Sequence, residues 1–95
     1  MVELKGASQE ARGDGTLVES EKAVRLILNV TYVDNAGLEV SSEEAEWFPK
    51  GHIKNNDGIW GCNEWLIAAK EKDIGNRLGA GNVQIMIDPD YEDGE

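Results

Sequence analysis

Two side chains that could do covalent chemistry occur once each in the sequence, the imidazole of His52 and the thiol of Cys62. A thiol activated by an imidazole is a nucleophile, so this pair would suit a small hydrolase if the fold brought the two together. The alternative is a buried strand cysteine and a solvated loop histidine, and we favour it because His52 lies in the polar run Lys50–Lys54. A lone cysteine also excludes an intrachain disulfide and a multi-cysteine zinc site.

Two further segments resemble ligand-binding loops. Acidic residues alternate in segment 88–95 as at the start of a calcium loop, but such a loop also needs a glutamate at its twelfth position and a following helix. We therefore expect residues 88–95 to be an acidic, solvated tail. The glycine-rich segment 75–81 follows a predicted helix and precedes a predicted strand, the reverse of the order in a dinucleotide-binding loop. The sequence predicts no metal and no other cofactor.

The large aromatic residues gather in the middle of the chain, at Trp47, Phe48, Trp60 and Trp65. Beside the bases of Lys50–Lys54 they could form a stacking platform for single-stranded nucleic acid. Neighbouring glutamates would repel a phosphate backbone, however, and a small domain gains much of its burial from tryptophan. We therefore predict that Trp47 and Trp65 lie in the core.

Acidic residues are the strongest signal in the sequence, with 19 acids against 9 bases and a net charge of −10. This balance argues against a protein that wraps nucleic acid, which needs stripes of lysine and arginine. It is compatible with a solubilising surface, and also with a negative surface that docks on a basic groove of another protein. The residues that we predict to contact such a partner are Glu39, Glu43, Glu44, Glu46, Asp88, Asp90, Glu92 and Asp93.

The clearest element is a strand over 23–33, where β-branched and aromatic residues alternate between two faces. The segment 34–37 has the composition of a hairpin turn. The returning strand is expected to begin at 38–40, to break at the polar residues 41–43 and to resume over 45–48, before Pro49 ends it.

Other elements are predicted from shorter patterns. Short strands are expected at 2–4, 16–18 and 59–62, with a polar loop over 51–58. Asn63 is suited to cap an amphipathic helix over 64–74, and Gly75 to end it. Val83, Ile85 and Ile87 alternate as one last strand.

These elements predict an α+β protein, either a small antiparallel sheet crossed by one helix near residues 64–74 or a partly open barrel of SH3-like or OB-like type. A length of 95 residues predicts one domain, and the sequence leaves open whether residues 1–15 are ordered or loosely ordered. The sequence contains neither a run of about 18 apolar residues nor the pattern of a signal peptide. We therefore expect a cytoplasmic protein.

The segments Glu44–Ile53 and Asn63–Lys72 together resemble a group of small phage-encoded proteins. In that group a strand ends in a Trp-aliphatic-Pro-Lys-Ser-Gln-Ile-like run, and a Glu-Trp-hydrophobic-Ala-Lys helix follows near the C-terminus. The match covers about 30 residues and departs at Gly51-His52, where the group has Ser-Gln. The resemblance implies a phage or prophage protein that acts inside a bacterial cell. It supplies no catalytic residue.

Two function hypotheses follow. By analogy with small acidic phage proteins, the first is a non-enzymatic inhibitor that binds a host protein with a basic surface, such as a nucleic-acid-binding defence complex. An anti-CRISPR protein that imitates nucleic acid would be of this kind. The second is an accessory module of phage replication or recombination that contacts single-stranded DNA or its binding protein.

Overall fold

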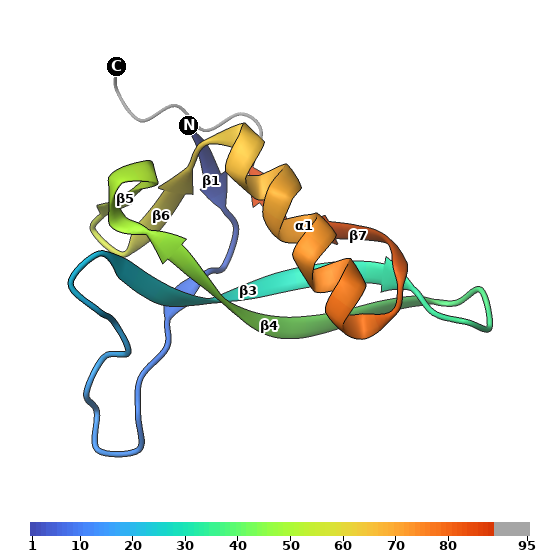
Figure 1. Cartoon of the computed structure of the whole chain (residues 1–95), viewed down its shortest axis with the longest axis horizontal. Coiled ribbons are helices and arrows are strands. Elements are labelled where there is room, and N and C mark those ends of the chain that lie inside the picture. The colour runs from blue at the N-terminus through green and yellow to red at the C-terminus, as the bar shows by residue number, and fades with distance from the viewer. Residues whose placement is uncertain (89–95) are drawn as a thin grey trace.

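The longest elements form a hairpin whose first strand is the predicted run of alternating apolar residues. This strand, β3 (Ala23–Val33), pairs with β4 (Glu39–Pro49) along its whole length without a register shift. The connecting turn is stabilised by Asp34, whose carboxylate accepts the backbone N–H groups of Ala36 and Leu38. In Figure 1 the hairpin runs as a long twisted ribbon beneath the helix.

The computed structural model describes residues 1–88. Within them the elements, in chain order, are β1 (Val2–Leu4), β2 (Ser8–Gln9), β3 (Ala23–Val33), β4 (Glu39–Pro49), a short 3-10 helix η1 (Lys50–His52), β5 (Ile53–Asn56), β6 (Ile59–Cys62), α1 (Glu64–Leu78), β7 (Gly81–Ile85) and β8 (Ile87–Asp88).

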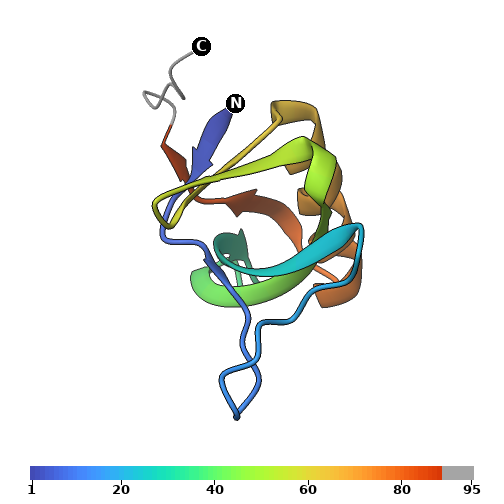
Figure 2. The same ribbon diagram turned by 90° about the vertical axis from the view of Figure 1, so that its left-hand side faces the viewer.

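The strands belong to two antiparallel sheets. One has the order β5-β6-β1-β8, and the other has the order β2-β3-β4, with β7 also paired to β3. The sheets are not closed into a barrel, and one helix packs with them, so the prediction of an α+β fold built on antiparallel sheets is confirmed. Figure 2 shows the hairpin, α1 and the β5-β6-β1-β8 sheet around a common interior, with the loop before β3 extending away from it.

One cluster of buried side chains joins the two sheets and the helix. Its largest fully buried members are Phe48, Leu4, Leu26, Leu28 and Ile74. Residues 1–15, whose order the sequence left open, contribute β1 and β2, and Val2 and Leu4 belong to the cluster.

Two predictions for the middle of the chain were wrong. The polar residues 41–43 do not interrupt β4, because each still pairs with β3. The predicted loop over 51–58 contains β5, which forms a hairpin with β6. Asp57 and Gly58 both have positive φ in the turn of this hairpin, the geometry for which Asp-Gly is favoured.

The C-terminal half also differs from the expectation. The helix continues past Gly75 to Leu78, and Gly79 ends it in the left-handed conformation. The expected last strand is divided at Met86, so that β7 joins one sheet and β8 the other. The segment 16–18 forms only an isolated bridge, between Leu17 and Ala11.

Candidate functional site

The acidic cluster of the sequence lies on β4, and the alternation of a strand divides it between two faces. The outer row consists of Glu39, Ser41, Glu43, Ala45 and Trp47. The inner row consists of Val40, Ser42, Glu44, Glu46 and Phe48. The inner row lies on the same face of the sheet as the buried residues of β3, because Phe48 pairs with Val24 and Glu46 with Leu26.

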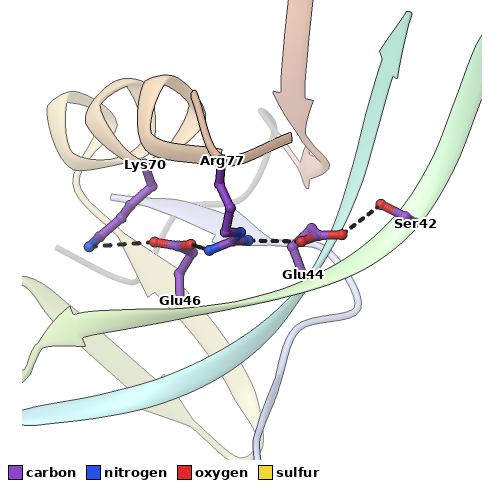
Figure 3. A network of polar contacts seen from close by, with 5 residues as sticks. All are labelled: Ser42, Glu44, Glu46, Lys70 and Arg77. Atoms are coloured by element: carbon purple, nitrogen blue, oxygen red, sulfur yellow. Dashed lines mark hydrogen bonds and ion pairs between the residues drawn. The ribbon is translucent and has the colours of Figure 1, made fainter. Parts of the chain in front are cut away.

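Cations from α1 pair with both glutamates of the inner row (Figure 3). Arg77 forms ion pairs with both Glu46 and Glu44, and its Nη2 lies 2.8 Å from Oε1 of Glu44. Lys70 Nζ lies 3.9 Å from Oε1 of Glu46 and also 5.5 Å from the centroid of the Phe48 ring. Ser42 donates its hydroxyl hydrogen bond to Glu44.

This network explains how the core side of a sheet accommodates two acids. Glu46 is only 8% exposed, and a buried carboxylate is tolerated when it is paired and hydrogen-bonded. The hydrogen bond to Glu44, followed by that to Glu46, raises the pKa of Arg77 above its usual value. The carboxylates of Glu44 and Glu46 are therefore already engaged within the chain.

The outer row is different, because its two acids are exposed and have no partner. Neither Glu39 nor Glu43 forms an ion pair or a side-chain hydrogen bond within residues 1–88. Trp47, at the end of the same row, is 43% exposed. The outer row therefore offers a free acidic surface that ends in an aromatic side chain.

The remaining predicted contact residues lie elsewhere. Asp88 is at the end of β8 in the other sheet and is partly buried. Asp90, Glu92 and Asp93 lie outside the described residues, as does most of the acidic tail. The structure thus divides the predicted set and leaves Glu39 and Glu43 as its open members on β4.

The prediction that Trp47 and Trp65 lie in the core is wrong. Trp65 is 59% exposed, while the core positions are taken by Phe48 and Trp60. The apolar stripe of α1 is formed by Leu66, Ile67 and Ile74, one position away from Trp65. The ring of Trp65 instead packs edge-on against His52, with the centroids 5.1 Å apart.

Cys62 is buried in β6 and His52 is exposed in η1, as the favoured interpretation of the sequence predicted. The Nδ1 atom of His52 lies 3.4 Å from the side-chain nitrogen of Asn63, whereas the buried Cys62 thiol donates to the backbone oxygen of Asn63. Burial raises the pKa of Cys62 to about 11. A thiol with such a pKa is protonated at neutral pH, which makes it a poor nucleophile.

Nothing in the part of the chain that the structure describes gathers three or more metal-ligating side chains. Most of the glycine-rich segment 75–81 belongs to the end of α1 and to its cap. Over residues 1–88 no helix combines the length and apolar character needed to cross a membrane.

Sequence reasoning missed Lys70 and Arg77, whose partners are 24 and 31 residues away along the chain. The alternation of β4 could have indicated them, because it places Glu44 and Glu46 on the same face as Phe48. Acids on a buried face require cations nearby. Basic residues on the helix that covers that face were the available candidates.

Comparison with known proteins adds no assignment, since no protein family, curated protein or solved structure matches this chain.

Proposed function

We propose that this chain is a non-enzymatic phage accessory protein that binds a basic surface of a host protein and inhibits it. The target class that we propose is a nucleic-acid-binding defence complex, so that the protein would act as an anti-CRISPR or related anti-defence inhibitor. The observation that carries this proposal is the outer row of β4, where Glu39 and Glu43 are exposed and unpaired. The net charge of −10 and the resemblance to small phage-encoded proteins support it.

The physical argument starts from the difference between paired and unpaired acids. An acid that is already paired within the chain, such as Glu44 with Arg77, has little to gain from a cation of another protein. An exposed acid without a partner can accept a lysine or arginine that normally holds a phosphate. The overall negative charge of the chain would also accelerate encounter with a basic groove, in a manner that salt weakens.

The test compares two charge reversals of equal size. Glu43→Lys changes the outer row, and Glu21→Lys changes an exposed acid in the turn before β3. Each purified variant and the parent is immobilised and exposed to a nuclease-treated bacterial lysate, and bound proteins are eluted with increasing salt. We expect the parent and Glu21→Lys to retain a basic nucleic-acid-binding protein that Glu43→Lys loses.

The retained protein is then assayed for nucleic-acid binding in the presence of each variant. Inhibition by the parent and by Glu21→Lys, but not by Glu43→Lys, is the expected result. Equal retention and equal inhibition by all three would contradict the role of the outer row.

The exposed tryptophans favour a second candidate, an accessory module that contacts single-stranded DNA. Trp47 and Trp65 are both available for stacking, and each stacked base contributes about 1–3 kcal/mol. The nearby Lys50 is however paired with Glu19, at 3.8 Å, which reduces its use for phosphate. A gel shift with labelled single strands at low salt tests this candidate. Retention that Trp65→Ala abolishes and Glu43→Lys preserves would support it over the inhibitor.

A further inference from the structure

β4 exposes backbone groups along one edge, in addition to the side chains that it exposes on one face. β4 pairs only with β3, so one of its two edges has no neighbouring strand within the described residues. Backbone groups in an antiparallel pair alternate, with every second residue bonded to the neighbour and the residues between them pointing to the other edge. The hydrogen bonds at the two ends of the hairpin therefore determine, for each residue of β4, whether its backbone N–H and C=O groups point to β3 or to the open edge.

Those hydrogen bonds show that the backbone groups of the outer-row residues point to the open edge. The Lys50 N–H donates to the Lys22 carbonyl, and the Asp34 N–H donates to the Leu38 carbonyl, so even-numbered residues of the hairpin bond to each other. Consistently, the odd-numbered Arg25 bonds away from β4, to residues of the N-terminal loop. The N–H and C=O groups that point to the open edge accordingly belong to Glu39, Ser41, Glu43, Ala45 and Trp47.

Backbone and side chains of the outer row thus present one continuous template. Five residues at alternate positions offer unpaired amide groups along an edge, together with two carboxylates and one indole on the face beside it. An extended segment that pairs with such an edge gains main-chain hydrogen bonds, while cross-strand side chains decide which segment fits.

We propose that β4 binds its partner by strand addition, and that the added segment is an extended stretch of a protein with lysine or arginine at alternate positions. Basic side chains of that segment lie opposite Glu39 and Glu43, where opposite charges stabilise a cross-strand pair. This inference rests on the proposed function and specifies the part of the partner that is recognised.

Charge decides between the candidate occupants of the edge. A second copy of this chain would bring another net charge of −10 to an acidic edge, which opposes self-association. Charged side chains on an edge also discourage pairing with neutral strands, a common protection of open sheets. A basic segment is the occupant that is attracted both by the net negative charge of the chain and by the acidic side chains at the edge.

The test uses a defined probe, a blocked nine-residue peptide in which lysine and threonine alternate. Hydrogen exchange of the backbone amides is followed by NMR on the whole chain with and without this peptide. In the free protein, the amides of Ser41, Glu43 and Ala45 should exchange fast and those of Ser42, Glu44 and Glu46 slowly. With the peptide bound, the fast set should become protected.

Two controls separate strand addition from charge attraction. The same peptide with N-methyl groups on alternate backbone nitrogens keeps its charge but cannot complete the ladder, and it should leave the fast set unprotected. The variant Glu43→Lys should weaken binding of the unmodified peptide by at least about fivefold, whereas Glu21→Lys should not.

Each other outcome overturns the inference in a recognisable way. Peptide binding without protection, or equal binding of the N-methylated peptide, would mean docking by charge alone, which leaves the proposed function standing. Protection of the fast set in the free protein, together with a dimer in sedimentation, would mean that a second copy occupies the edge. Failure of the peptide to bind at millimolar concentration would exclude strand addition of a basic segment. The comparison of host-protein retention by Glu43→Lys and Glu21→Lys would still test the proposed function.

Discussion

The two rows of β4 have similar numbers of acids but opposite environments. On the inner row, Glu44 and Glu46 face the helix and are paired with Arg77, and Glu46 also with Lys70. On the outer row, Glu39 and Glu43 face solvent and have no cation within the described chain. One strand thus carries a structural pair of acids and an available pair, separated only by the alternation of the backbone.

This difference shows that a cluster of like charges in a sequence is not one surface. The inner acids help to hold α1 over the sheet, because the cations that pair with them belong to α1. The outer acids make no ion pair or side-chain hydrogen bond within residues 1–88, and the proposed function assigns them to partner binding. Substitutions that affect one row and not the other test this division.

The largest expected effect contrasts two adjacent aromatic residues on opposite rows. Phe48→Ala should lower the free energy of unfolding by about 3–5 kcal/mol, because Phe48 is fully buried and the substitution leaves a cavity. Trp47→Ala should cost less than about 1 kcal/mol, since its ring lies on the exposed row. Urea unfolding of both variants beside the parent measures this difference. A loss of about 3 kcal/mol in Trp47→Ala would mean that the outer face is covered.

A second test uses Cys62, a buried ionisable group that lacks the ion pairs of Glu46. Its pKa is raised to about 11 in the folded chain from a reference value of 9.0, chiefly by burial. The folded state therefore holds the thiol proton more tightly than the unfolded state does. The resulting stabilisation is complete below pH 9 and is lost as the pH rises towards 11.

The expected loss over this range is on the order of 2 kcal/mol. Lysines and tyrosines titrate in the same range, so the quantity to measure is the difference in unfolding free energy between the parent and Cys62→Ala. This difference should shrink as the pH is raised. A difference that stays constant would show that the thiol is as well solvated in the folded chain as in the unfolded chain.

A third test removes the cation shared by the inner acids. Arg77→Ala leaves Glu46 with Lys70 alone and Glu44 with no cation within the described residues, and we expect the free energy of unfolding to fall by about 1–2 kcal/mol. The figure is moderate because the Arg77 side chain is 45% exposed and water screens its charge. In a Glu44→Gln/Glu46→Gln background, Arg77→Ala should lower the free energy of unfolding by a smaller amount. Arg12→Ala, in the exposed loop before β3, serves as the control.

The elements that the sequence predicted correctly are those set by local pattern. The strand over 23–33 has the predicted limits, because β-branched residues alternate throughout it. The start of the helix after Asn63 was also predicted correctly. Its end was not, because Gly75 costs a helix only about 1 kcal/mol, and Ile74 and Leu78 on either side of it pack in or against the core.

The candidate site could be predicted only in part, because contacts between residues far apart in the chain decide which of its acids are paired. The acids were identified, but their division into rows required a continuous β4, and the predicted break at 41–43 concealed it. The tryptophans were misplaced because amino-acid type favours burial, whereas strand and helix periodicity place Trp47 and Trp65 on exposed faces. Which cation reaches which acid is decided by the packing of α1, and no local pattern specifies it.

The smallest expected effect concerns the outer acids themselves. Glu39→Gln and Glu43→Gln remove charge while keeping side-chain size, and each should change the free energy of unfolding by less than about 0.5 kcal/mol. Any change should be stabilising, since removing one of 19 acids from a chain of net charge −10 reduces its self-repulsion. Glu46→Gln, on the inner row, should instead destabilise by about 1 kcal/mol, because it weakens the pairing with Arg77 and Lys70. Urea unfolding of the three variants at low and high salt measures both rows in one experiment. Equal destabilisation by Glu43→Gln and Glu46→Gln would show that the outer acid has an internal partner in solution, and the distinction between a structural and an available row would then fail.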